Sequence, residues 1–160
     1  MPALADWTSH LSQIWTDVRL RQTLELRAAD GLPYQYIPAV PALWVGLTYH
    51  PASRKAAWEL LQDHTPEDYQ TTMWELPIKG LTATFGRDSV REIGGELARL
   101  ARIGLQARVD AGIERPAVLR YLDPIEEILD TGTTFAEDCV RRWDSDFGRD
   151  PGKYVVAYRI

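Results

Sequence analysis

One short segment of the chain carries polar side chains at five alternate positions, four of them charged. These positions are Arg19, Arg21, Thr23, Glu25 and Arg27. A period of two is typical of a β-strand, because successive side chains of a strand point to opposite faces. On such a face a carboxylate can bind Mg²⁺, and an arginine two residues away can contact a phosphoryl oxygen. Alternatively, these polar side chains have no binding role and simply cover the solvent-exposed face of an antiparallel sheet.

The other side chains with reactive groups favour structural roles. His10, His50 and His64 lie far apart and lack the paired spacing of a metal site, so we interpret them as surface or helix-end histidines. Cys139 is the only cysteine, which excludes an intrachain disulfide and a zinc-binding thiolate cluster. We interpret Cys139 as a small packing residue.

The composition predicts one globular domain over residues 1–160. Hydrophobic residues make up 45% of the chain and charged residues 26%, which excludes wholesale disorder. The net charge of −5 argues against a general nucleic-acid-binding surface, and no apolar run approaches the roughly 20 residues of a membrane span. The first residues, MPALAD, lack the basic and apolar regions of a signal peptide, so we expect a cytoplasmic protein.

Apolar side chains at helical spacing predict about six or seven helices around one strong amphipathic strand. The expected helices cover residues 6–15, 41–49, 54–62, 65–75, 90–109, 123–129 and 133–143. Residues 79–86 are expected to form a loop and residues 154–158 a short β-prone run. The predicted fold class is therefore α+β and mostly helical.

The strand, over residues 19–28, is expected to pack Leu24 and Leu26 beneath the helices while Glu25 and Arg27 share the other face. A lone strand cannot satisfy its own backbone donors and acceptors. We therefore expect its partner strands to lie outside this chain or in the C-terminal run. An exposed strand edge also favours self-association.

Two blocks of sequence stand out, DVRLRQTLELRAADG at residues 17–31 and PALWVGLTY at residues 41–49. They resemble the plant and proteobacterial type of glutamate–cysteine ligase, where the family usually has EVRLKxYLEMRGADGGPW and LPAFWVGLLYD. The blocks GLTATF, at 80–85, and YLDPIEEILDTGTTFAE, at 121–137, resemble further family segments in the same order. The resemblance runs nearly end to end, but it matches only the C-terminal portion of that longer family.

The resemblance implies the C-terminal part of a glutamine-synthetase-like catalytic domain. Its reaction joins glutamate and cysteine to γ-glutamylcysteine, the first step of glutathione biosynthesis, with ATP and Mg²⁺. By position, Glu25 matches a metal ligand and Arg27 the arginine that contacts the transferring phosphate. Arg19 and Arg21 match basic positions on the same strand that serve nucleotide or substrate.

Departures from the family pattern leave two hypotheses open. Gln35 and Tyr36 stand where the family commonly has a pair of arginines, and Ala28 stands where it usually has glycine. The first hypothesis is a partial ligase that needs an N-terminal half and is inactive alone. The second is a non-catalytic helical binding module derived from the ligase fold. Retention of Glu25 and Arg27 favours the first, and loss of the basic pair favours the second.

Overall fold

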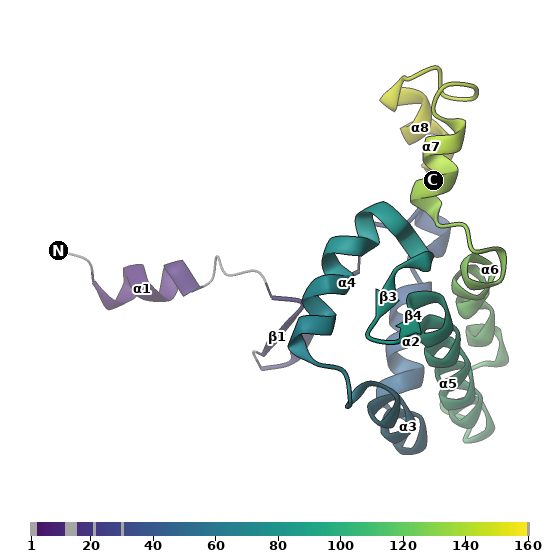
Figure 1. The fold of residues 1–160 in the computed structure, drawn as a ribbon. Helices are drawn as coiled ribbons and strands as arrows, with labels where there is room; N and C mark the ends of the chain where they lie inside the picture. Colours follow the sequence, from purple (N-terminus) through teal and green to yellow (C-terminus); the bar gives the residue numbers. More distant parts are fainter. Residues whose placement is uncertain (1–2, 12–15, 21, 30, 160) are drawn as a thin grey trace. The chain divides into compact units, whose positions relative to one another are not determined.

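The computed structural model describes residues 3–11, 16–20, 22–29 and 31–159. The chain forms two compact units, Met1–Gly31 and Leu32–Ile160, and most of its described residues are helical (Figure 1). Eight α-helices and two small β-hairpins lie in these described ranges. The predicted α+β, mostly helical class is confirmed, with one helix more than the sequence indicated.

The first unit contains a helix and a β-hairpin. Helix α1 covers Leu4–Leu11, and strands β1, Val18–Leu20, and β2, Leu24–Leu26, pair antiparallel. The single strand expected over residues 19–28 is therefore wrong, because the chain reverses between the two strands. A hairpin supplies part of each strand with backbone partners, which a lone strand cannot do.

Polar and apolar side chains alternate between the two faces of this hairpin, as predicted. However, the polar face is the more buried one and the apolar face is exposed. Glu25 and Arg27 are half-buried, whereas Leu24 and Leu26 are 68% and 39% exposed. The expectation that both leucines pack beneath helices is wrong. A two-stranded ribbon has no second layer of its own, and the helix of the same unit, α1, has no buried residue in Leu4–Leu11.

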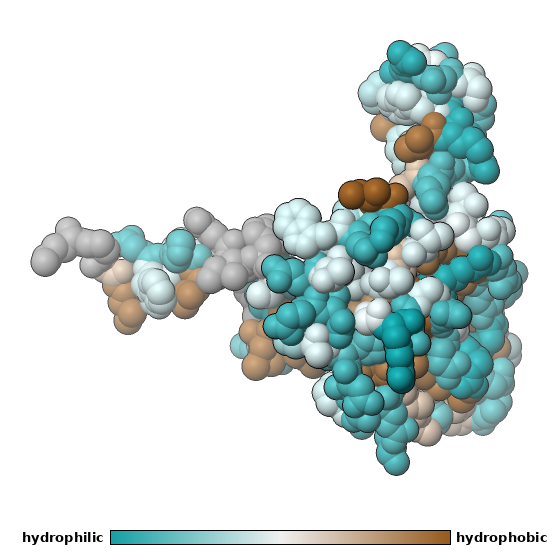
Figure 2. Space-filling view, in the orientation of Figure 1, coloured by the Kyte–Doolittle hydropathy of each residue, from teal (hydrophilic) through white to brown (hydrophobic). Residues whose placement is uncertain are grey.

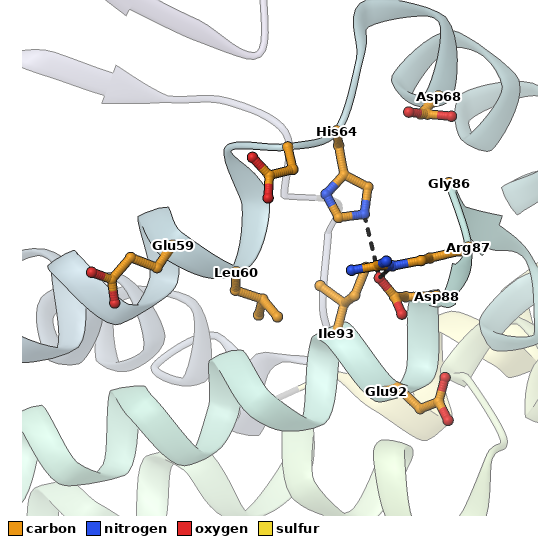
Figure 3. Close-up of a pocket in the computed structure, with 10 residues that line it drawn as sticks. Glu59, Leu60, His64, Asp68, Gly86, Arg87, Asp88, Glu92 and Ile93 are labelled. Atoms are coloured by element: carbon orange, nitrogen blue, oxygen red, sulfur yellow. Dashed lines mark ion pairs between the residues drawn. The ribbon is translucent and has the colours of Figure 1, made fainter.

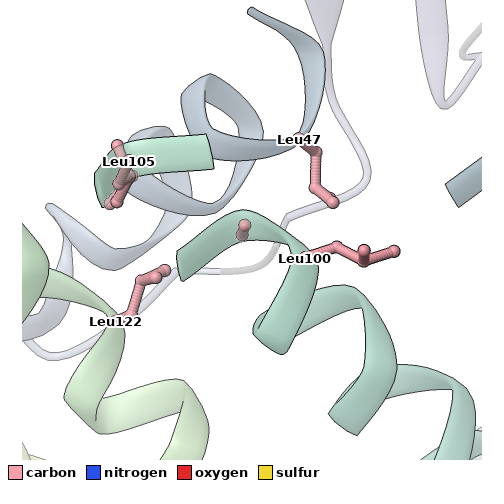
Figure 4. Packing of buried hydrophobic residues seen from close by; sticks show 6 residues of the cluster. Leu47, Leu100, Leu105 and Leu122 are labelled. Carbon is pink, nitrogen blue, oxygen red and sulfur yellow. The ribbon is translucent and has the colours of Figure 1, made fainter. Parts of the chain in front are cut away.

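The core of the second unit lies where α2, Ala39–Thr48, crosses α5, Val90–Asp110. Leucines from these two helices and from a neighbouring 3₁₀ helix, η3, interlock there (Figure 4). The elements that pack against this crossing are α3 (Pro51–Leu61), η3 (Pro116–Leu122) and α6 (Asp123–Thr131). The 3₁₀ helix η1 covers Tyr34–Tyr36, and helix α7 covers Phe135–Arg142. The helices predicted over α2, α3, α5, α6 and α7 are confirmed, with ends that shift by a few residues.

Helices α2 and α5 touch through their backbones at two glycines. A Cβ atom on Gly104 would lie 1.9 Å from the carbonyl oxygen of Gly46, and one on Gly46 would lie 2.2 Å from that of Ala101. Any side chain at these positions would push the helices apart. Side chains such as Leu47 and Leu105, which are 6% and 0% exposed, reach across this close crossing.

Three helices begin within two residues of the starts expected at residues 65, 90 and 133. The side chains of Thr65, Ser89 and Thr134 each accept a hydrogen bond from the backbone N–H three residues later. The acidic side chain of that later residue in turn accepts a hydrogen bond from the backbone N–H of the capping residue. These reciprocal capping boxes satisfy donors that helix starts otherwise leave open. They fix the first turns of the helices that follow Thr65, Ser89 and Thr134.

Helix α4 covers Pro66–Lys79 and passes through Pro77, although we expected it to end before that proline. Proline removes one intrahelical hydrogen bond, but near a helix end the last turn can continue beyond it. Residues 79–86 were expected to form a loop. They instead include the 3₁₀ helix η2, Gly80–Thr82, and strand β3, Thr84–Phe85, which pairs with β4, Asp88–Ser89.

The C-terminal run is a helix, α8 (Pro151–Tyr158), rather than the expected strand. Asp150 accepts a hydrogen bond from the Gly152 N–H and so starts the helix. Helical spacing then brings both Tyr154 and Tyr158 against Phe147, with ring centroids 5.6 and 6.5 Å away. This aromatic packing overrides the β-propensity of the run.

We expect Gly104→Ala to lower the free energy of unfolding by about 2–3 kcal/mol or more, because the added methyl overpacks the α2–α5 contact. The control is Gly95→Ala on the same helix, where an added Cβ meets nothing within 4 Å. Gly95→Ala should raise stability by about 0.5–1 kcal/mol through helix propensity. Urea denaturation of the three proteins measures both effects. Equal effects of the two substitutions would contradict the close crossing.

Candidate functional site

Arg19 and Glu25 face each other across the N-terminal hairpin. They are direct partners in the register of β1 and β2. The Nε and Nη2 atoms of Arg19 donate to the Oε2 atom of Glu25 at 2.8 and 2.6 Å. Their side chains are 29% and 34% exposed. The structure therefore brings together two of the predicted site residues in a cross-strand ion pair.

The other two predicted residues are Arg27, which the structure describes, and Arg21, which it does not. The backbone N–H of Arg27 donates to the Asp17 carbonyl at 2.8 Å, which extends the pairing one step beyond the hairpin strands. Arg27 is half-buried and follows Glu25 at the spacing of one strand face. Arg21 lies outside the described residues.

Glu25 offers the hard oxygen ligand that Mg²⁺ prefers, but Arg19 already binds one of its two oxygens. Within the ranges that the structure describes, no group of three or more His, Cys, Asp or Glu side chains is placed to hold a metal ion. This part of the chain therefore fits Mg²⁺ as a donor of one carboxylate and cannot supply a complete coordination shell.

A hollow of about 850 Å³ opens in the second unit (Figure 3). It lies between the end of α3, the start of α4, the β3–β4 turn and the first turn of α5. Its lining residues are Glu59, Leu60, Asp63, His64, Asp68, Gly86, Arg87, Asp88, Glu92 and Ile93. Carboxylates dominate this lining.

His64 forms one wall of the hollow and joins α3 to the small hairpin. Its ring stacks on Phe85 with centroids 4.1 Å apart. Its Nε2 atom lies 3.0 Å from the Phe85 carbonyl oxygen and its Nδ1 atom 3.3 Å from that of Leu61. The Asp88 carboxylate is 3.7 Å from Nε2 (Figure 3). The helix-end position expected for His64 is confirmed. Its contacts with residues distant in sequence left no signal in the spacing of the histidines.

Two carboxylates of this hollow serve as helix caps. The backbone and hydroxyl of Thr65 donate to Asp68, and these hydrogen bonds lower the pKa of that carboxyl. The hydroxyl and backbone of Ser89 likewise lower the pKa of Glu92. Both groups thus stay ionised because they satisfy helix N-termini. Their role in this hollow is to hold α4 and α5 in place.

Residues 3–152 of the chain match the protein family described as Glutamate-cysteine ligase family 2. The chain belongs to this family. It is 32% identical over 151 residues to the chloroplastic glutamate–cysteine ligase of Arabidopsis thaliana, and the match covers 93% of this chain and 27% of that protein. It is 33% identical over 160 residues to glutamate–cysteine ligase A, chloroplastic, of Oryza sativa subsp. indica, with 99% and 31% covered.

The chain thus spans less than a third of the length of these relatives, and most of each relative lies outside the matched segment. Among the described residues, no helix is both long and apolar enough to cross a membrane.

We expect His64→Ala to lower the free energy of unfolding by about 1–3 kcal/mol, since it removes a half-buried ring stack and the hydrogen bond that the ring donates to a backbone carbonyl. His10→Ala, at an exposed position of α1, is the matched control and should change stability by less than about 0.5 kcal/mol. Urea denaturation compares the two variants. A His64→Ala protein as stable as the His10→Ala protein would show that His64 does not join α3 to the hairpin.

Proposed function

We propose that this chain is the C-terminal part of an ATP-dependent ligase that joins the γ-carboxylate of glutamate to the amine of cysteine. The family match over residues 3–152 carries the proposal. The names of the relatives, glutamate–cysteine ligases, supply the reaction. The half-buried Arg19, Glu25 and Arg27 supply charged groups of the kind that this chemistry requires.

In this proposal the reaction first activates the γ-carboxylate by phosphoryl transfer from ATP, after which the cysteine amine displaces the phosphate. Arg27 would bind a phosphoryl oxygen and stabilise the negative charge that develops during transfer. Glu25 would contribute one oxygen ligand to Mg²⁺, which neutralises the nucleotide phosphates when bound. Arg19 and Arg21 would bind nucleotide or substrate.

The proposed ligase needs further chain to complete its site. The hairpin exposes an apolar face formed by Val18, Leu20, Leu24 and Leu26, which are between 39% and 79% exposed. Additional strands and a covering layer would bury this face and satisfy the free hairpin edges. We propose that the remaining part of the ligase provides them. The proposed compartment is the cytoplasm, whereas the names of the relatives place those proteins in the chloroplast.

A non-catalytic binding module is the second candidate, and one observation favours it. The Tyr36 ring stacks on Phe135 with centroids 4.9 Å apart and an interplanar angle of 13°. A position where the family commonly has arginine therefore packs η1 against α7 in this chain. Because Tyr36 is uncharged, the chain has one positive group fewer at this position for binding an anionic substrate.

The purified 160-residue chain should not form γ-glutamylcysteine from glutamate, cysteine, ATP and Mg²⁺. One carboxylate on a two-stranded hairpin cannot hold a metal–nucleotide complex in the near-octahedral geometry that Mg²⁺ demands. Release of ADP and appearance of the dipeptide are the measurements. Dipeptide formation that Glu25→Ala abolishes would contradict the need for a further part of the ligase.

In a chimera in which this chain replaces the matching segment of the Oryza sativa ligase, Arg27→Ala should lower turnover on the order of 10²-fold. Loss of one transition-state charge contact typically costs about 3 kcal/mol. Arg99→Ala, which removes a surface arginine paired with Glu96 on α5, is the control. Steady-state rates and melting temperatures separate chemistry from folding. Unchanged turnover in the Arg27→Ala chimera would favour the binding module.

A further inference from the structure

A second hollow, of about 440 Å³, opens in the second unit between η1, α6, α7 and α8. One face of α6 lines it through Pro124, Glu127, Ile128 and Thr131, whose spacing of three and four residues places them side by side. Tyr36 of η1 lines it as well. We call this space the α6 hollow. Its volume is typical of sites that bind small organic molecules.

Hydrogen bonds fix the helices around the α6 hollow. Arg91 of α5 donates from Nε and Nη2 to the carbonyls of Leu129 and Asp130 at 2.6 and 2.5 Å, which holds the end of α6. The Nη1 atom of Arg142 donates to the Tyr158 hydroxyl at 2.9 Å, which joins α7 to α8. The walls of the hollow are therefore preformed, and a ligand loses less of its binding energy to ordering them.

Both arginines that line the α6 hollow already have acidic partners. The Nη2 atom of Arg141 donates to Asp138 at 2.5 Å, and the Nε atom of Arg142 donates to Asp146 at 2.7 Å. The hydrogen bond from Arg141 lowers the pKa of the Asp138 carboxyl, so that group stays ionised. Much of the surface around α7 and α8 is hydrophilic (Figure 2). The two positive charges of the hollow are thus each matched by a negative one.

Glu127 adds a negative charge that is not matched in this way. Its carboxylate is exposed, and in the part of the chain that the structure describes it has no hydrogen bond or ion pair. The stacked rings of Tyr36 and Phe135 line the same hollow. A carboxylate and aromatic ring faces both attract an ammonium group. Ile128, next to Glu127, supplies apolar surface for the rest of such a ligand.

We propose that the α6 hollow binds a small organic monoamine, with its ammonium group on the Glu127 carboxylate and its apolar body against Tyr36 and Ile128. A ligand with one positive charge balances the charges that line the hollow, whereas an anion would be repelled by Glu127. Because Glu127 is exposed, its ion pair is weak, and the expected dissociation constant lies in the millimolar range. The proposal concerns the second unit alone and does not depend on the ligase reaction.

An NMR titration of the purified 160-residue chain with phenethylamine, a cation at neutral pH, tests the proposal. The neutral ligand 2-phenylethanol has nearly the same shape and should bind about tenfold more weakly or worse, because it lacks the charge. Glu127→Gln should weaken phenethylamine binding by a similar factor. Asp130→Asn is the matched control, since Asp130 is an exposed carboxylate of the same helix that does not line the hollow, and it should leave binding unchanged.

A second set of variants locates the ligand. Tyr36→Ala should weaken binding, and Tyr36→Phe, which keeps the ring, should restore it. Circular dichroism confirms that each variant is folded. A wild type without saturable phenethylamine binding would overturn the proposal, as would equal binding of phenethylamine and 2-phenylethanol. Binding that survives Glu127→Gln but is lost in Asp63→Asn would also overturn it, because the amine would then occupy the hollow beside His64.

Discussion

The backbone contact between Gly46 and Gly104 sets the geometry of the second unit. Two helices that meet at glycines approach more closely than helices separated by side chains, so the leucines beside the contact reach into the opposite helix. Leu105 and Leu122 are completely buried as a result. Helix α5 is also the longest element, and α3, η3 and α6 all pack against it. The position of each of these elements therefore depends on how closely α2 can approach α5.

The same crossing positions the hollow beside His64. Ser53 is buried on α3 and donates to the Leu100 carbonyl of α5 at 2.7 Å, which fixes α3 against the central helix. The His64 ring then connects the end of α3 to the small hairpin that leads into α5. The hollow is thus enclosed on several sides by elements tied to α5. Two of its carboxylates, Asp68 and Glu92, are used by helix caps, and a third, Asp88, lies 3.7 Å from His64.

Local signals in the sequence predicted the helices of this unit, and tertiary contacts decided where the prediction failed. An apolar stripe at helical spacing predicted a helix from residue 90, and α5 does begin at Val90, with Ser89 as its cap. Residues 154–158 were misread because β-branched and aromatic residues favour strands only where a partner strand exists. The turn after Leu20 was missed because it interrupts neither the polar nor the apolar period of the segment.

The candidate site was predictable in its residues and unpredictable in its pairing. Alternation placed Arg19 and Glu25 on one face, but only the hairpin register places them opposite each other. That pairing constrains the proposed chemistry. Both nitrogens of Arg19 bind a single oxygen of Glu25, Oε2. In the proposed site, a divalent cation on the same carboxylate would lie close to the Arg19 guanidinium, and the repulsion between the two cations would weaken its binding. Phosphate groups of a bound nucleotide would supply the negative charge that both cations need.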